Sequence, residues 1–211
     1  KGDIMSELLA PAGSWEALEA AVKNGLLTGS DGYIKASDNM TRAEMATIMV
    51  RACGATKEAD ISSFTDVRPD EWFYTAMARA VAMGAFNGSD NKLEPTKPIT
   101  RQEAFVVLSR VFGLDVDDNS ELAALADFKD ADKIADWAEG GVAAIVYNGY
   151  VAGNEGYINP LSNISRAESV PLLTGIQAFQ QDEGTFTFNS LTSAGQVSTS
   201  EGTYRLSAEM K

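Results

Sequence analysis

The chain has 211 residues, of which 45% are hydrophobic and 22% charged, a globular composition that excludes a disordered or fibrous protein. Its formal net charge of −13 argues against a nucleic-acid ligand, because phosphate binding depends on clustered Lys and Arg. Histidine is absent and Cys53 is the single cysteine, which excludes Ser-His-Asp and Cys-His catalysis, His-ligated zinc and an internal disulfide.

A short motif that occurs three times sets the register of the predicted elements. It reads Thr-Arg-Ala-Glu at 41–44, Thr-Arg-Gln-Glu at 100–103 and Ser-Arg-Ala-Glu at 165–168. Each copy has the form of a capping box and so predicts a helix start. The predicted structural caps are Thr41, Glu44, Thr100, Glu103, Ser165 and Glu168. The arginine after each cap is unexpected, because a cation at the positive end of the helix dipole costs about 0.3–1 kcal/mol.

Upstream of each motif, the pattern predicts a helix followed by a glycine loop. Apolar residues at helical spacing form three stripes: Trp15, Leu18, Ala21 and Val22; Trp72, Met77, Ala80 and Val81; and Trp137, Val142, Ile145 and Val146. The predicted helix ends are Gly25, Gly84 and Gly149. The loops begin at Gly29, Gly88 and Gly153, each twelve residues before its cap. In Phe64-Thr-Asp66 and Phe128-Lys-Asp130 the aspartate is expected to cap the helix or turn the chain into it.

Residues 56–63 and 114–126 are predicted connections. The second is acidic, but Ser120 stands where a calcium loop needs Gly, so we expect a solvated linker and no metal site or cofactor. Pro171 and Gly175 should kink or shorten the helix begun at Ser165. From Gln180 onward, alternating Thr and aromatic residues predict two or three short strands.

The ordered combination of Phe-x-Asp, Trp, a helix ending in Gly, the glycine loop, Pro95 or Pro160 and Thr-Arg-x-Glu resembles the S-layer homology (SLH) repeat. The resemblance covers about residues 15–179 and implies repeats at 1–55, 56–114 and 115–179, followed by a β-rich segment at 180–211. It implies a mainly α, monomeric, pseudo-threefold helical spindle. It also implies a non-catalytic module that anchors proteins to the bacterial cell surface by binding anionic, often pyruvylated, secondary cell-wall polysaccharide in grooves between repeats.

The resemblance also implies which residues contact the ligand. The family's arginine falls on Arg42, Arg101 and Arg166, and its loop glycines on Gly29, Gly88 and Gly153. Removing Arg101 should then weaken binding with little loss of stability. The alternative is that each arginine pairs with a neighbouring acid in this acidic protein. Trp72 and Trp137 are core anchors or, less favoured, platforms for sugar rings.

The stretch from Ser6 to Gly25 resembles the opening strand and helix of the U32 peptidase family. That family's cysteine-containing signature is absent here, and the chain cannot build its barrel, so we expect no enzyme activity. A remnant of such a peptidase, or a glycosidase with paired carboxylates, remains an alternative. A third alternative is a structural protein whose repeats self-associate in a surface lattice.

No membrane-spanning run of about 18 apolar residues and no signal-peptide pattern is found, so membrane insertion is not expected. The location that the SLH resemblance implies is extracellular, at the bacterial cell wall.

Overall fold

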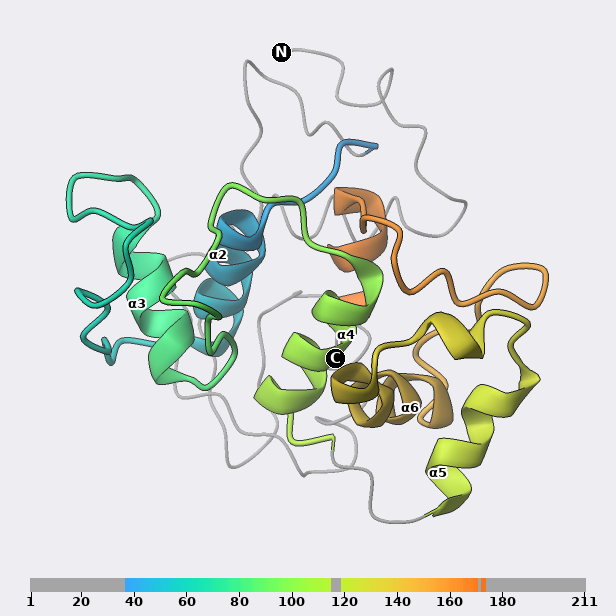
Figure 1. The fold of residues 1–211 in the computed structure, drawn as a ribbon. Helices are drawn as coiled ribbons and strands as arrows, with labels where there is room; N and C mark the ends of the chain where they lie inside the picture. The colour runs from blue at the N-terminus through green and yellow to red at the C-terminus, as the bar shows by residue number, and fades with distance from the viewer. Residues whose placement is uncertain (1–36, 115–118, 171, 174–211) are drawn as a thin grey trace, which may run out of the picture.

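The computed structural model describes residues 37–114, 119–170 and 172–173 of the chain, and this part is helical (Figure 1). Its helices are α2 (Arg42–Cys53), α3 (Tyr74–Ala82), α4 (Arg101–Val111), α5 (Asn119–Ala123), η2 (Ala124–Asp127), η3 (Ala131–Lys133), η4 (Asp136–Ala138) and α6 (Glu139–Tyr147). Residues 166–170 and 172–173 are also helical. Among these described residues, extended pairing is confined to isolated bridges. The prediction of a mainly α fold is confirmed for this part.

Several predicted features lie outside the described residues. They are the helix from Trp15 to Gly25, the loop at Gly29, the sequence resembling U32 peptidases, the effect of Pro171 and Gly175, and the strands of 180–211.

All three repeated motifs begin helices as predicted. The cap hydroxyl accepts a hydrogen bond from the amide of the motif's Glu at Thr41 (3.1 Å), Thr100 (3.3 Å) and Ser165 (3.2 Å). Within the described part of the chain, the reciprocal bond that completes the capping box is present only at Thr41, whose amide donates to Glu44 at 3.4 Å. The local motif therefore starts each helix, but the glutamates also have partners elsewhere.

The predicted glycine helix ends are confirmed at α3 and α6. Gly84 and Gly149 adopt φ of +76° and +77°, the left-handed conformation in which glycine carries no steric penalty. The next amides close the last turn: Ala85 N–H donates to the Ala80 carbonyl at 3.0 Å, and Tyr150 N–H to the Ile145 carbonyl at 3.1 Å.

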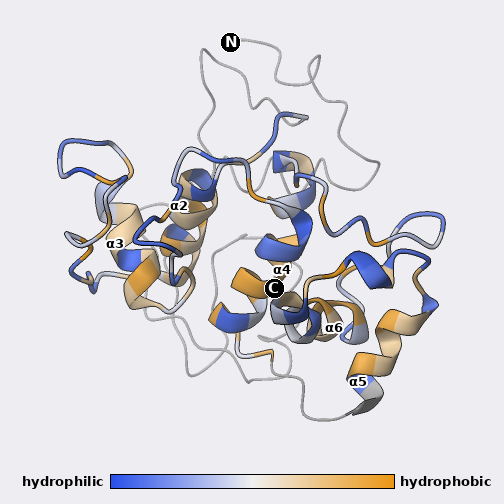
Figure 2. Ribbon diagram, in the orientation of Figure 1, coloured by the Kyte–Doolittle hydropathy of each residue, from blue (hydrophilic) through white to orange (hydrophobic). Residues whose placement is uncertain are grey.

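The helices pack in pairs that join one predicted repeat to the next. α2 packs against α3 and α4 against α6, with α4 lying between the two groups (Figure 1). The second contact is close, because a Cβ on Gly141 of α6 would stand 2.8 Å from Cα of Val106 in α4. Polar and apolar segments alternate along the helices (Figure 2), and the buried side chains form one core. No repeat in the described part therefore encloses its own apolar face.

A closed ring of backbone hydrogen bonds joins the residues that precede the three caps. Met40 N–H donates to the Ile164 carbonyl (3.0 Å), Ile164 N–H to Ile99 (3.0 Å), and Ile99 N–H to Met40 (2.8 Å). All three residues are fully buried. The three motifs, distant in sequence, are thus held around a common centre.

Two sequence predictions about these elements are wrong. Residues 114–126 are not simply a linker, because α5 and the start of η2 lie within them and both pack against α6. Trp72 and Trp137 are not core anchors, because they are 69% and 57% exposed. Both precede their helices, α3 and α6, and the residues after them, Phe73 and Ala138, are buried instead.

Candidate functional site

The candidate site is built on two glycine loops that have the same backbone conformation. In the first, Ser89 and Lys92 exchange both backbone hydrogen bonds (2.9 and 2.8 Å) around two residues of positive φ. In the second, Asn154 and Tyr157 do the same, with both bonds at 2.9 Å. This exchange across two left-handed residues is typical of a tight β-turn.

Phe-x-Asp fixes these loops rather than capping a helix. The Asp66 carboxylate accepts from the amides of Leu93 (2.9 Å) and Glu94 (2.7 Å). Asp130 accepts in the same way from Ile158 and Asn159, both at 2.9 Å. Of the two roles expected for these aspartates, capping the helix and turning the chain into it, the first is wrong. Their two oxygens bind two successive loop amides, which fixes the direction of the carbonyl between them.

The phenylalanine of the same motif explains the loop glycines. A Cβ on Gly88 would lie 2.4 Å from Phe64 Cε1, and one on Gly153 would lie 2.6 Å from Phe128 Cε1. Both glycines also have positive φ, +71° and +73°. Close contact and backbone conformation each require glycine here. Gly88 and Gly153 thus have a structural role, whether or not a ligand contacts them.

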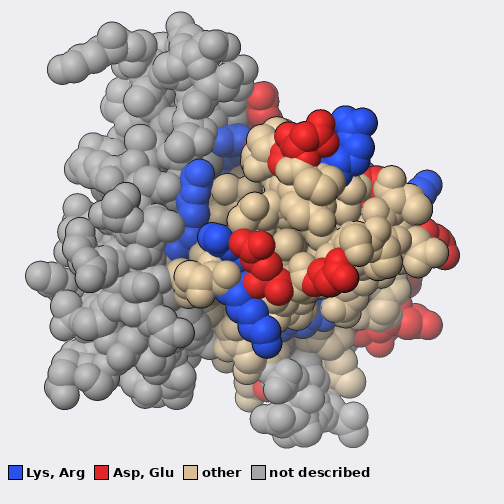
Figure 3. All heavy atoms as spheres, turned by 90° about the vertical axis from the view of Figure 1, so that its left-hand side faces the viewer, with Lys and Arg blue, Asp and Glu red and all other residues tan. Residues whose placement is uncertain are grey.

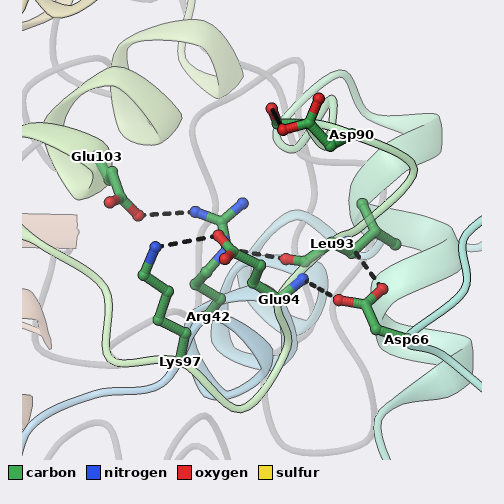
Figure 4. A network of polar contacts seen from close by, with 8 residues as sticks. Arg42, Asp66, Asp90, Leu93, Glu94, Lys97 and Glu103 are labelled. Atoms are coloured by element: carbon green, nitrogen blue, oxygen red, sulfur yellow. Dashed lines mark hydrogen bonds and ion pairs between the residues drawn. The ribbon is translucent and has the colours of Figure 1, made fainter.

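Arg42 contacts both the glycine loop and the repeated motif of the next repeat. Its Nε donates to the Leu93 carbonyl at 2.9 Å, and its Nη1 lies 2.7 Å from Oε2 of Glu103 (Figure 4). The guanidinium also lies 4.9 Å from the centre of the Phe86 ring. We call the group of Arg42, Leu93, Glu94, Lys97 and Glu103 the Arg42 site.

Arg101 repeats this arrangement one repeat later. Its Nε donates to the Ile158 carbonyl at 2.9 Å, and its Nη1 pairs with Oε2 of Glu168. Arg101, Ile158, Asn159, Ser162 and Glu168 form the Arg101 site. The two sites correspond residue by residue, because each loop is held by an equivalent aspartate.

Arg166 closes the cycle, since its Nη1 pairs with Oε2 of Glu44. The equivalent of Leu93 in this third position is Ile34, which lies outside the described residues. The arginine of each motif therefore pairs with the glutamate of the next motif in the cycle. This explains the cation at each helix start: the neighbouring carboxylate of another repeat offsets the unfavourable dipole.

The helix N-terminal amides are not free to bind an anion. At α2, Arg42 N–H donates to the Lys97 carbonyl (3.0 Å) and Ala43 N–H to that of Pro95 (2.8 Å). At α4, Arg101 N–H donates to Ser162 (2.8 Å) and Gln102 N–H to Pro160 (3.0 Å). The following amide of each helix is bound to the cap hydroxyl.

Each of the two arginines nevertheless retains one open donor. Among the described residues, Nη2 of Arg42 and of Arg101 has no hydrogen-bond partner, and it is not fully buried. The side chains are 14% and 15% exposed, and the bonds at Nε and Nη1 hold each guanidinium while its Nη2 stays unpaired. An external anion could accept from that edge without displacing the glutamate.

The remaining chemistry of the described part is limited. Burial raises the pKa of the Cys53 thiol to about 12, which keeps it protonated and unreactive at neutral pH. The described residues contain no cluster of His, Cys, Asp or Glu suited to a metal, and none of their helices has the length and hydropathy to cross a membrane. Basic and acidic side chains are interspersed on the face in Figure 3.

Sequence reasoning missed two parts of these sites, the loop carbonyls and the partner glutamates. A signal was present for both: Asp66 stands 27 residues before Leu93, and Asp130 stands 28 before Ile158, while every motif contains both an Arg and a Glu. Pairing across repeats could be inferred from these regularities only with knowledge of how the repeats meet.

A chain in which three copies of one motif exchange arginines around a closed ring is a cyclic helical repeat protein. The sequence model of the S-layer homology domain matches residues 10–46, 63–105 and 127–168, which together make up more than half of the chain. The chain belongs to the S-layer homology domain family. This domain is a non-catalytic anchoring domain.

Curated relatives carry the same region as part of longer chains. The Surface-layer 125 kDa protein of Lysinibacillus sphaericus is 33% identical over 159 residues, 72% of this chain and 13% of that protein. The Cellulosome-anchoring protein of Acetivibrio thermocellus is 29% identical over 150 residues, 67% of this chain and 33% of that protein. The Amylopullulanase of Thermoanaerobacterium thermosulfurigenes is 25% identical over 163 residues, 76% of this chain and 9% of that protein. The chain thus spans a third or less of these relatives.

Proposed function

We propose that this chain is a non-catalytic, extracellular module that anchors a protein to the bacterial cell wall. Its ligand is anionic secondary cell-wall polysaccharide, with pyruvate ketals as the carboxylate-bearing groups, bound between neighbouring repeats. The full set of three repeats forms a monomeric, pseudo-threefold helical spindle. The ring of Met40, Ile99 and Ile164 supports this symmetry for the described residues.

The observation that carries the proposal is the open Nη2 edge of Arg42 and Arg101. Each guanidinium is already oriented by a loop carbonyl and a glutamate, so binding costs little side-chain entropy. A ligand carboxylate that accepts from this edge gains a charge-assisted hydrogen bond of about 1.5–3 kcal/mol. Arg166, which pairs with Glu44, is proposed as the arginine of the third site.

Trp72 and Trp137 are proposed as sugar platforms. They are exposed aromatic rings, and large apolar surface in contact with water favours association. Trp137 stands two residues after Ala135, whose amide donates to Gln102 at 3.0 Å, and Gln102 is adjacent to Arg101. The tryptophan is therefore tied to the start of α4 that carries the Arg101 site.

The loop glycines, Gly29, Gly88 and Gly153, are proposed to support binding mainly through loop shape. At the two described positions a side chain would collide with phenylalanine and with a loop carbonyl. The collision would displace the loop and shift the carbonyl that orients the arginine. The position of the unpaired Nη2 would then change as well.

Binding to isolated cell-wall sacculi tests the proposal directly. The purified chain should sediment with sacculi that carry the secondary polymer and should stay in the supernatant when the polymer has been stripped. Chemical removal of the pyruvate ketals from the polymer should weaken binding if carboxylates meet the arginines. Equal binding to stripped sacculi would reject the proposed ligand.

Self-association in a surface lattice is the competing function, and the exposed Trp72 and Trp137 also fit it. Size-exclusion chromatography at rising protein concentration separates the two. A monomer at all concentrations favours anchoring, whereas growing assemblies that form without polymer favour the lattice.

A further inference from the structure

The Arg42 and Arg101 sites differ at one position whose backbone conformation is unusual. The residue after the oriented carbonyl is Glu94 in the first site and Asn159 in the second. Their φ angles are +51° and +53°. Asparagine tolerates this left-handed region, but glutamate rarely adopts it. The same loop geometry thus accepts Asn readily and holds Glu under strain.

The strain at Glu94 is imposed by the loop and not relieved by the side chain. Asp66 holds its amide at 2.7 Å, as Asp130 holds that of Asn159 at 2.9 Å. The Glu94 side chain is exposed and makes an ion pair with Lys97 at 3.1 Å, in which the two side chains are 46% and 52% exposed. An exposed pair of this kind contributes little to stability. Folding alone therefore gives no reason for glutamate at this position.

The position is adjacent to the open arginine edge. Glu94 is bonded directly to Leu93, whose carbonyl accepts from Arg42 Nε at 2.9 Å. Lys97 belongs to the same segment, and its carbonyl accepts from the Arg42 amide at 3.0 Å, with Asp90 at the far end of the loop (Figure 4). In the Arg101 site the corresponding residues are Asn159 and Ser162, both uncharged. A ligand carboxylate at Arg42 meets a nearby negative charge that a carboxylate at Arg101 does not meet.

We infer that the residue at this position sets the charge preference of each site, an inference that rests on the proposed function. Asn159 leaves the Arg101 site open to the more negatively charged residues of the polymer. Glu94 weakens the binding of such residues at the Arg42 site relative to the Arg101 site. Lys97 offsets Glu94 only partly, because an ion pair between two exposed side chains is weakened by solvent.

Two substitutions test the inference in opposite directions. Glu94→Asn should tighten binding of the full chain to polymer fragments that carry pyruvate ketals by about three- to tenfold, since a repulsive charge near the arginine is removed. Asn159→Glu should weaken binding by a similar factor. Adding Ser162→Lys to Asn159→Glu should recover part of the loss. All three effects should shrink in 0.5 M salt, where charges are screened.

Asp90→Asn is the matched control. Asp90 lies in the same loop with φ of +50° and is exposed, so the substitution makes the same change of charge away from Arg42. It should leave affinity unchanged. For polymer fragments from which acid has removed the pyruvate ketals, the affinities of the variants should differ far less than for the intact fragments.

Titration calorimetry with both fragments, beside a thermal melt of each variant, separates the outcomes. Unchanged affinity of Asn159→Glu, or equal effects of Glu94→Asn and Asp90→Asn, would overturn the inference while leaving the anchoring function intact. Failure of the unmodified chain to bind either fragment would reject the proposed function, and the inference with it.

Discussion

Nη1 of Arg42 lies 2.7 Å from Oε2 of Glu103, although the two residues are 61 positions apart in the chain. Both belong to the same short motif, in successive copies. This pair, repeated between Arg101 and Glu168 and between Arg166 and Glu44, joins every motif to the next. The arginines therefore contribute to the assembly of the repeats before any ligand arrives.

Arg101→Ala should destabilise the fold, contrary to the expectation from sequence. The substitution removes the pair with Glu168, the bond to the Ile158 carbonyl and the contact with Phe105. Because Glu168 is 36% exposed, we expect a loss of about 1–3 kcal/mol, below that of a fully buried pair. Urea unfolding measures it. Arg110→Ala, at the exposed end of the same helix, is the control and should change stability by less than about 0.5 kcal/mol.

Asp130→Asn should destabilise the protein through one loop. The carboxylate is 3% exposed and accepts from Ile158 and Asn159, so an amide in its place turns one acceptor into a donor facing a donor. A loss of about 2–3 kcal/mol is expected. Hydrogen exchange should show faster opening at Ile158 and Asn159. The exposed Asp132→Asn should leave both stability and exchange unchanged; equal effects of the two substitutions would contradict the loop role.

The substitutions Gly88→Ala and Gly84→Ala distinguish the stability cost of a steric collision from that of an unfavourable backbone conformation. Both glycines have positive φ, but a Cβ at Gly84 meets open space, whereas one at Gly88 meets Phe64 and the Lys92 carbonyl. We expect Gly84→Ala to cost about 1–2 kcal/mol and Gly88→Ala a further 1–3 kcal/mol. Adding Phe64→Leu should recover only part of the second loss, because the carbonyl remains. Similar midpoints of denaturation for the two glycine variants would refute the packing explanation.

Deletion of residues 127–179 should abolish cooperative folding of the remainder. It removes Ile164 from the backbone ring, Glu168 from Arg101 and Arg166 from Glu44, and it exposes the face of α4 that α6 covers. Circular dichroism should show reduced helicity and a broad melt. If the shortened chain kept a sharp transition, the ring would not be needed for folding.

Cys53 should be inert in the folded protein. With its pKa raised to about 12 by burial, almost no thiolate is present at pH 8, and a disulfide reagent should react only after denaturation. The pKa is raised above its ordinary value of 9.0, so the unfolded chain loses this proton first. The free energy of unfolding should therefore fall above about pH 9, and Cys53→Ala should reduce that fall.

The sequence by itself determined the features that depend on near neighbours. Thr41, Thr100 and Ser165 begin helices because a hydroxyl binds an amide three residues on, and Gly84 and Gly149 end them because glycine tolerates positive φ. The equal spacing of the copies showed that the chain repeats, and the order of motifs indicated the family. All of these contacts span a few residues, so they can be read without knowing the fold.

Only the tertiary structure decided which groups meet across repeats. The carboxylate of Glu103 pairs with Arg42 of α2 without completing its own capping box, whereas that of Glu44 bonds the Thr41 amide and also pairs with Arg166. Asp66 can cap a helix or bind a loop 27 residues away, and the tertiary fold brings that loop within 2.9 Å of its carboxylate. Trp72 fits a core stripe by spacing, yet the chain enters α3 after it and leaves it in water. In each case the outcome depends on distances that the packing of several repeats fixes.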